Sequence, residues 1–396
     1  MKILKNVLLW VLLIALIASA AGIFRLRLIQ LNAEQDELQE EKEAAVLAAE
    51  SSPEPTPAPT PTPTPTPEPE PEFFKLSFIG DCTLWSSVQF ELNDVGLPKV
   101  VGENYAYPFS NTVQYFSDDE YTFANLECTF SDTKLYSGQQ FYFRAPSSYA
   151  NILVEGDVDF VTTANNHTLD FDEIGAQRTL EALDAVKIPH GSERQGQVVT
   201  TKNGLSIGIY TAGNDMRPDW KTDEAVAAVK EMKAQGVDLV ICMFHWGLEL
   251  YYSPNDNQIN LAHACIDAGA DIVYGSHPHC LQPIEKYNNG IIMYSMGNWC
   301  FGGSTRPSDP DTAIVQVTIK RDVDGTISTE GFEVIPCCVS SNIEGAMNMS
   351  DNYNNYCPTP YPEDSEGYQR VMSKLDGSYQ PKSQGADYSN FYASWG

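Results

Sequence analysis

Side chains able to bind a metal ion or transfer a proton follow five short apolar segments of this 396-residue chain. They are Asp81, Glu127, the pair Asn166 and His167, His245, and the pair His277 and His279. The chain contains six histidines, and four of them lie in this series. Each residue taken alone has an ordinary explanation, such as a turn, a helix cap or a hydrogen-bonded core group. Their recurrence at five segment ends predicts a shared site.

The residue types in this series favour divalent metal ions. Two carboxylates, one carboxamide oxygen and three or four imidazoles form a ligand set without thiolates, which suits Zn, Mn or Fe. Two such ions sharing a carboxylate bridge would clamp the attacking and leaving oxygens of a displacement reaction. The series therefore predicts a pair of divalent ions and displacement chemistry at a phosphoryl group.

Composition excludes one class of partner. The chain has 24 basic and 53 acidic residues, a formal net charge of −29, so it has no surface built to neutralise a nucleic-acid backbone. Hydrophobic residues make up 42% of the chain, enough for a sizeable core. An anionic substrate would need a local positive element in so acidic a protein, and a bound metal ion would supply one.

Strands that alternate with helices must position these side chains. Apolar runs rich in β-branched or aromatic residues predict strands at Lys75–Ile79, Thr122–Leu126, Phe160–Ala164, Ser206–Tyr210, Leu239–Phe244, Ile272–Tyr274 and Ile291–Ser295. Apolar periodicity predicts helices at Asp172–Val186, Thr222–Ala234 and Gln258–Ala268. The alternation indicates an α/β fold, in which sites form where strands end. The strands at 206–210 and 291–295, with those beyond Ala313, could form a second sheet.

Three segments precede this fold. Residues 1–27 contain 18 consecutive apolar or small residues, Val7 to Phe24, which predict a transmembrane signal anchor. The alternative is a cleaved signal peptide with Ala18-Ser19-Ala20 at its cleavage site. Residues 28–50 predict a helical stalk, and the Pro, Thr and Glu tract at 51–72 predicts a semi-rigid spacer. We therefore expect a single-pass protein of the cell membrane with its C-terminal domain extracellular.

In order along the chain, these motifs resemble the CapA family, the poly-γ-glutamate group of the calcineurin-like metallophosphatase superfamily. The resemblance covers roughly Leu76 to Phe301 and rests on Gly80-Asp81, Asn125-Leu126-Glu127, Ala164-Asn165-Asn166-His167, His245-Trp246-Gly247, Gly275-Ser276-His277-Pro278-His279 and Tyr294-Ser295-Met296-Gly297-Asn298. It implies a four-layer α-β-β-α sandwich for a domain at residues 73–345, followed by a C-terminal wrapping segment or tail at 346–396.

The resemblance also implies a role for each residue of the series. Asp81 and His279 would bind a first metal ion, Glu127 would take the bridging place, and Asn166, His245 and His277 would bind a second ion. His167 would donate a proton to the leaving group or steady the transition-state oxygen.

Two departures from the superfamily pattern affect the first metal position. Asp81-Cys82-Thr83 lacks the imidazole of the usual Asp-x-His motif, and Glu127 stands where a shorter bridging Asp is usual. The first position is therefore short of a ligand, which leaves a single-metal site open. Cys82 points away from Asp81 by strand alternation, so we expect it to be a buried strand residue.

Arg144 is the one basic residue that we assign to the site. It could clamp a phosphate or carboxylate with two parallel hydrogen bonds, and a surface ion pair is an equal alternative. The expected function is poly-γ-glutamate or capsule polymer synthesis, with capsule synthase subunits or an anionic polymer as partners. The alternative is a non-catalytic assembly or polymer-binding subunit with a vestigial metal site.

Overall fold

The computed structural model describes residues 69–87, 93–133, 137–138, 141–213 and 222–381. The predicted anchor, the stalk and most of the spacer lie outside the described residues, as does the end of the predicted C-terminal segment. Within the described ranges, no helix has both the length and the apolar character needed to cross a bilayer.

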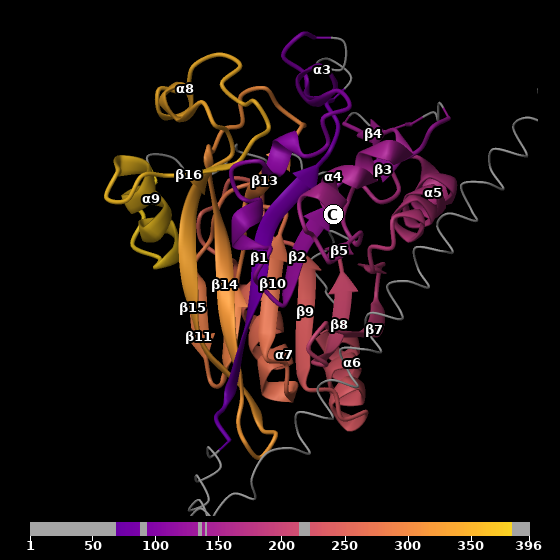
Figure 1. The fold of residues 1–396 in the computed structure, drawn as a ribbon, viewed down its shortest axis with the longest axis vertical. Coiled ribbons are helices and arrows are strands. Elements are labelled where there is room, and N and C mark those ends of the chain that lie inside the picture. The colour runs from indigo at the N-terminus through magenta and orange to yellow at the C-terminus, as the bar shows by residue number, and fades with distance from the viewer. Residues whose placement is uncertain (1–68, 88–92, 134–136, 139–140, 214–221, 382–396) are drawn as a thin grey trace, which may run out of the picture. The chain divides into compact units, whose positions relative to one another are not determined.

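Two mixed β-sheets form the centre of the described domain (Figure 1). The first runs in the order β16 (Thr359–Pro360), β15 (Ile327–Cys338), β14 (Asp311–Arg321), β1 (Glu72–Thr83), β2 (Tyr121–Leu126), β5 (Phe160–Thr162) and β6 (His190–Gly191), with β13 (Asn298–Phe301) also paired to β1. The second runs in the order β11 (Ile284–Tyr287), β12 (Gly290–Met293), β10 (Ile272–Ser276), β9 (Leu239–His245), β8 (Ser206–Ala212) and β7 (Gln195–Thr200). A separate short pair is formed by β3 (Thr129–Phe130) and β4 (Arg144–Ala145).

Helices cover the outer faces of both sheets. Strand alternation sends Phe78 of β1 into the core between the sheets and its neighbour Ile79 to the outer face of the first sheet. Helices α4 (Asn151–Glu155) and α5 (Asp172–Ala185) pack on that outer face, and α6 (Thr222–Ala234) and α7 (Asp256–Ala268) pack on the outer face of the second sheet. The layers therefore follow the order α-β-β-α.

Shorter helical elements complete the described chain. They are α3 (Leu97–Val101), α8 (Ile343–Met347), α9 (Glu366–Leu375), and three 3₁₀ turns at Tyr107–Phe109, Val113–Tyr115 and Ser147–Ala150.

Parallel pairing brings the predicted site residues to one edge of each sheet. In the first sheet, β1 and β2 are parallel, with Asp81 opposite Asn125. In the second sheet, β9 and β10 are parallel, with His245 opposite Ser276. The buried Tyr274 hydroxyl of β10 donates a hydrogen bond to the main-chain carbonyl of Ile79 on β1, at 2.9 Å. This bond joins the two sheets two residues before Asp81.

The predicted strands and helices are present, with ends shifted by a few residues. Helix α7 begins two residues before its predicted start because Asn255 and Gln258 form a reciprocal capping box. The predicted division into sheets is wrong, since β8 and β12 share the second sheet with β9 and β10, whereas β14 and β15 join the first. The reason is that β14 pairs antiparallel with β1 along its first seven residues, Glu72 to Phe78.

A buried ion cluster anchors α9 to the start of β14. The Lys374 ammonium lies 2.7 Å from both Asp309 carboxylate oxygens and 2.6 Å from Asp311 Oδ2. Arg370 donates to both oxygens of Asp311 at 2.6 Å. Lys374 and both carboxylates are almost completely buried, so each charge depends on its partners in this cluster, which we call the α9 ion cluster.

Candidate metal centre

The structure brings the predicted ligands together where the strands of the two sheets end. Three overlapping groups of buried or half-buried side chains place their ligand atoms within 4.8 Å of one another. The groups are Glu127 with His245 and His277, Asp81 with Glu127 and His279, and Glu249 with His277 and His279. In the first sheet, Asp81 lies in β1 and Glu127 directly follows β2. In the second, His245 is the last residue of β9, and His277 and His279 follow β10.

The separations in the first group match the spacing of ligands around one cation. His245 Nε2 lies 2.8 Å from Asn166 Oδ1, 3.1 Å from His277 Nδ1 and 3.5 Å from Glu127 Oε1. Ligand atoms bound to one ion at about 2.0–2.2 Å lie about 2.8–3.6 Å apart in tetrahedral or octahedral geometry. Asn166, His245, His277 and Glu127 are therefore spaced to hold one divalent ion.

A second ligand group lies beside the first and shares Glu127 with it. His279 Nδ1 lies 3.3 Å from Asp81 Oδ2, and its Nε2 lies 3.9 Å from Glu127 Oε1. Glu249 adds a third carboxylate beside His277 and His279. The sharing of Glu127 fits the bridging place that the sequence resemblance implies for it.

The cluster contains buried polar atoms that the described protein leaves without a hydrogen bond. Both carboxylate oxygens of Glu127 and the Nε2 atom of His277 are in this state. Burial, with the Asp81 charge added to it, raises the pKa of Glu127 well above its ordinary value. Buried acceptors are almost always paired, and an unpaired one costs about 1–3 kcal/mol or more. A cation between these atoms would satisfy them, so the residues present fit a metal ion.

The histidines differ in their protonation. Burial lowers the pKa of His277 to about 3 and lowers that of His245 well below its ordinary value, so both imidazoles are neutral at pH 7. Neutral imidazole is the form that binds metal ions. For His279, burial acts in the same direction, but the carboxylates of Glu127 and Asp81 outweigh it and raise the pKa to about 10.

Two asparagines behind the cluster hold its ligands in place. Asn125 Nδ2 donates to Asp81 Oδ1 at 2.8 Å and lies 3.3 Å from His245 Nδ1. Asn165 Nδ2 donates in turn to Asn125 Oδ1 at 3.0 Å. Sequence reasoning did not assign these two residues a role, although both belong to the motifs quoted above. The signal in the sequence is their closeness to the predicted ligands: Asn125 lies two residues before Glu127, and Asn165 lies directly before Asn166.

Ser276 is a further residue that sequence reasoning missed. Its hydroxyl lies 2.9 Å from His245 Nδ1 and also reaches the main-chain carbonyl of Phe244 at 3.3 Å. This contact leaves Nε2 as the ring atom that faces Asn166 and His277. Ser276 therefore fixes the orientation of the His245 ring.

We expect Ser276→Ala to weaken metal binding about 10–100-fold, because the imidazole loses the partner that orients it. Competition titration of the purified full-length chain with a metal-sensitive dye measures this change. The matched control is Ser328→Ala on β15, whose hydroxyl contacts only the exposed Glu330. Equal metal affinity in the Ser276 variant and the control would contradict the orienting role.

The backbone around the cluster adopts conformations that few residues other than glycine favour. His277 and His279 have φ angles of 96° and 52°, in the left-handed region that only a few per cent of residues other than Gly occupy. In this conformation the His277 amide reaches Asp81 Oδ2 at 3.4 Å. A Cβ atom at Gly80 would lie 2.2 Å from the Gly297 carbonyl, so only glycine allows β1 to approach this turn.

The remaining predicted residues lie in different surroundings. His167 Nδ1 is 2.9 Å from Asp170 Oδ2, and its ring packs edge-on against Phe143. Cys82 lies in the core on the outer face of the first sheet, which confirms its prediction as a buried strand residue. Arg144, on β4, donates to the main-chain carbonyl of Ser131 at 2.9 Å.

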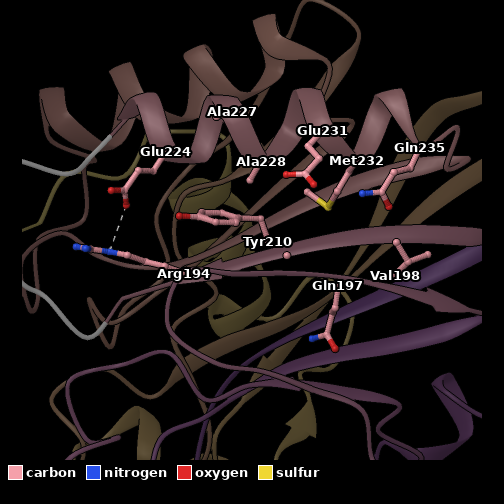
Figure 2. Close-up of a pocket in the computed structure, with 11 residues that line it drawn as sticks. Arg194, Gln197, Val198, Tyr210, Glu224, Ala227, Ala228, Glu231, Met232 and Gln235 are labelled. Carbon is pink, nitrogen blue, oxygen red and sulfur yellow. Dashed lines mark ion pairs between the residues drawn. The ribbon is translucent and has the colours of Figure 1, made fainter.

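Two cavities differ in their relation to the cluster. One of about 400 Å³ lies between β7 and α6, where Arg194 and Glu224 form an ion pair at 3.7 Å beside Tyr210 (Figure 2). None of the predicted site residues lines it. A smaller cavity of about 180 Å³ is lined by His279 and Glu249 of the cluster and by Asn298. The smaller cavity is therefore the space next to the candidate metal centre.

Comparisons with known proteins agree with the sequence resemblance. Residues 75–303 match the family described as bacterial capsule synthesis protein PGA_cap. The PGA biosynthesis protein CapA of Bacillus subtilis (strain 168) is 30% identical over 281 residues, which cover 66% of this chain and 70% of that protein. The capsule biosynthesis protein CapA of Bacillus anthracis is 27% identical over 288 residues, covering 66% of each chain.

Among solved structures, NAD nucleotidase from Haemophilus influenzae aligns with a TM-score of 0.38 and 13% identity, covering 82% of this chain and 67% of that one. The family match extends over more than half of this chain and includes every residue of the candidate metal centre. This chain belongs to the bacterial capsule synthesis PGA_cap family.

Proposed function

We propose that this chain is an extracellular, membrane-anchored CapA-like protein of poly-γ-glutamate or capsule polymer synthesis. Its cluster would bind one or two divalent ions and act as a hydrolase or transferase site of the metallophosphatase type. One observation carries the proposal: Asn166 Oδ1, His277 Nδ1 and Glu127 Oε1 lie 2.8, 3.1 and 3.5 Å from His245 Nε2, and both Glu127 oxygens are buried without a hydrogen bond among the described residues. Capsule synthase subunits or the anionic polymer itself are the proposed partners.

Two positions for Mn, Zn or Fe follow from the ligand groups. The first ion would be held by Asp81, His279 and the shared Glu127, and the second by Asn166, His245, His277 and Glu127. When bound, such ions supply Lewis-acid polarisation and a nucleophile at neutral pH. In an acidic protein they also supply the local positive charge that an anionic substrate requires.

His167 is the proposed proton donor to the leaving group. Its Nδ1 atom is held by the buried Asp170 carboxylate, which fixes the ring and leaves Nε2 as the atom that exchanges a proton. His167 also lies close enough to contribute to the lowered pKa of His277. Arg144 stays a separate prediction, because it does not line the cavity beside the cluster.

The export of the domain rests on the sequence alone. The apolar run from Val7 to Phe24 would anchor the chain, and the Pro-rich tract would hold the domain away from the membrane. Capsule polymer assembled outside the cell requires a domain on that side of the membrane. A protease added to intact cells is expected to digest the domain.

A second candidate is a non-catalytic assembly subunit. The observation in its favour is the shortage of ligands at the first metal position, where Thr83 stands in place of an imidazole. The Thr83 hydroxyl is buried and has no hydrogen-bond partner among the described residues. A scaffold of this kind would need the fold of the domain but no turnover.

Metal counting and turnover together test the proposal. The full-length chain, stripped of metal and reloaded with Mn or Zn, is expected to hold one or two ions by elemental analysis. His245→Ala combined with His277→Ala should abolish binding, whereas His263→Ala on α7 should not, because His263 stacks on Tyr287 outside the cluster.

Turnover is then assayed with the fully loaded chain. The substrates are a generic phosphodiester and poly-γ-glutamate, and metal-dependent cleavage of either is the expected result. A chain that binds no metal overturns the proposal. A loaded chain without turnover, whose double variant still supports polymer output in cells, establishes the assembly subunit instead.

A further inference from the structure

We propose that Arg306 and the cavity of about 180 Å³ form a subsite for an oxyanion of the substrate, the carboxylate of a γ-linked glutamyl unit. The identity of this unit rests on the proposed function. The cavity joins the metal cluster to a segment beyond the matched family region, which ends at residue 303. Its lining consists of Glu249, Leu250, His279, Asn298, Phe301, Ser304, Arg306, Pro307 and Ser308.

The cavity has a different chemical character at each part of its wall. His279 and Glu249 belong to the metal cluster, and Asn298 binds His279 Nδ1 through its side-chain oxygen at 3.0 Å. Arg306 brings a positive charge to the same wall. A ligand in this space therefore lies beside the cluster and within the field of a guanidinium group.

The Arg306 guanidinium donates no hydrogen bond to a carboxylate among the described residues. Its Nε atom donates to the Met349 carbonyl at 2.7 Å, and no carboxylate pairs with it among the residues that the structure describes. By contrast, Arg321 pairs with Glu72, and Arg370 pairs with Asp311. In a chain of net charge −29, an arginine without an acidic partner beside the site is suited to an external oxyanion.

The segment that carries Arg306 is fixed before any ligand binds. The Asn354 side chain donates to the Ser304 carbonyl at 2.9 Å, and the Tyr353 hydroxyl donates to the Pro307 carbonyl at 2.7 Å. Two residues further on, Asp309 is held by Lys374 in the α9 ion cluster. Because the backbone of this segment is held on both sides of Arg306, little ordering cost opposes binding.

Size and wall chemistry favour one short acidic unit. Cavities for drug-sized ligands measure about 300–1,000 Å³, so this smaller space admits a short group. Phe301, Leu250 and Pro307 offer apolar surface to methylene groups, while Arg306 offers two parallel donors to a carboxylate. A γ-linked glutamyl unit combines two methylenes with a free carboxylate next to the amide that links it onward.

Equilibrium binding of γ-linked triglutamate tests this inference on the metal-loaded, full-length chain. Isothermal titration is expected to show at least tenfold weaker binding for Arg306→Gln, with partial recovery in Arg306→Lys, which keeps the charge but loses the planar fork. Arg321→Gln, the same change at the far end of β14, is the control and should bind as the wild type does. The metal count should be equal in all these variants.

Three results would overturn the inference. The first is unchanged triglutamate binding by Arg306→Gln, and the second is loss of binding in Arg144→Gln instead. The third is binding of inorganic phosphate at this site without binding of triglutamate, which would make the ligand a phosphate group. Arg306-dependent binding without turnover would support the subsite while rejecting the hydrolase. Turnover of poly-γ-glutamate that does not depend on Arg306 would support the hydrolase and reject the subsite.

Discussion

Glu127→Gln is expected to have opposite effects on metal binding and on the stability of the metal-free protein. Metal affinity should fall by more than about 100-fold, which exceeds the loss usual for residues that only orient a ligand. The metal-free variant should be more stable than the wild type at pH 8, because a neutral amide replaces a buried acid whose pKa is raised by burial and by the Asp81 charge, so that the acid is costly to keep at this pH. Its amide can also donate toward His245 Nε2, which lies 3.5 Å from Glu127 Oε1.

Thermal unfolding with chelator and with added Mn measures both effects of this substitution. A rise of a few degrees is expected in chelator, since about 1 kcal/mol corresponds to roughly 2–4 °C for domains of this size class. The increase that Mn produces in the wild type should be absent. Glu333→Gln is the matched control, because Glu333 forms only an exposed pair with Lys75. A metal-free Glu127 variant less stable than the wild type would show that the carboxylate has a structural partner.

Lys374→Met is expected to destabilise the domain by about 3–5 kcal/mol, the usual cost of removing one partner from a buried ion pair. Lys374 is held between Asp309 and Asp311, and the substitution leaves both carboxylates buried with Arg370 as the remaining cation of the cluster. Methionine preserves most of the side-chain volume, so the loss reports on charge. Urea unfolding followed by fluorescence gives the difference in free energy.

Two further variants separate the charge from the packing of α9. Lys374→Met combined with Asp309→Asn should recover part of the lost stability, because one of the uncompensated charges is removed. Lys320→Met breaks an exposed pair with Asp322 and should leave the urea midpoint unchanged. A single Lys374 variant as stable as the Lys320 variant would show that the α9 ion cluster does not stabilise the fold.

The convergence of the ligands could be predicted because strand ends are a local feature. Asp81 and His245 lie in the last residues of buried strands and His277 directly follows one, and parallel pairing brings such ends to one edge. The partition of strands between sheets could not be predicted in this way. Pairing of β14 with β1 joins residues more than two hundred positions apart, and no local pattern encodes that choice.

The arginine proposed for the substrate shows a different limit of sequence reasoning. The scarcity of basic residues favours Arg144 from the sequence, whereas the structure places Arg306 in the cavity beside the cluster. Arg306 lies in a Gly-, Ser- and Pro-rich stretch that has no apolar periodicity. Its position depends on contacts with Tyr353, Asn354 and Lys374, all of which come later in the chain. Only the folded C-terminal segment defines where this arginine lies.

The origin of the ligands in two different sheets has a mechanical consequence. The oxygen ligands Asp81 and Glu127 come from the first sheet, and the nitrogen ligands His245 and His277 come from the second. The hydrogen bond from Tyr274 to Ile79 joins the two sheets close to these ligands. A cation bound to both sets of ligands would cross-link the two sheets. Its binding free energy would add to the free energy of unfolding of the domain. Removal of the metal by a chelator would then weaken the contact between the two sheets, and amide hydrogens along β1 and β10 would exchange faster. The supply of metal would in this way govern the rigidity of the domain.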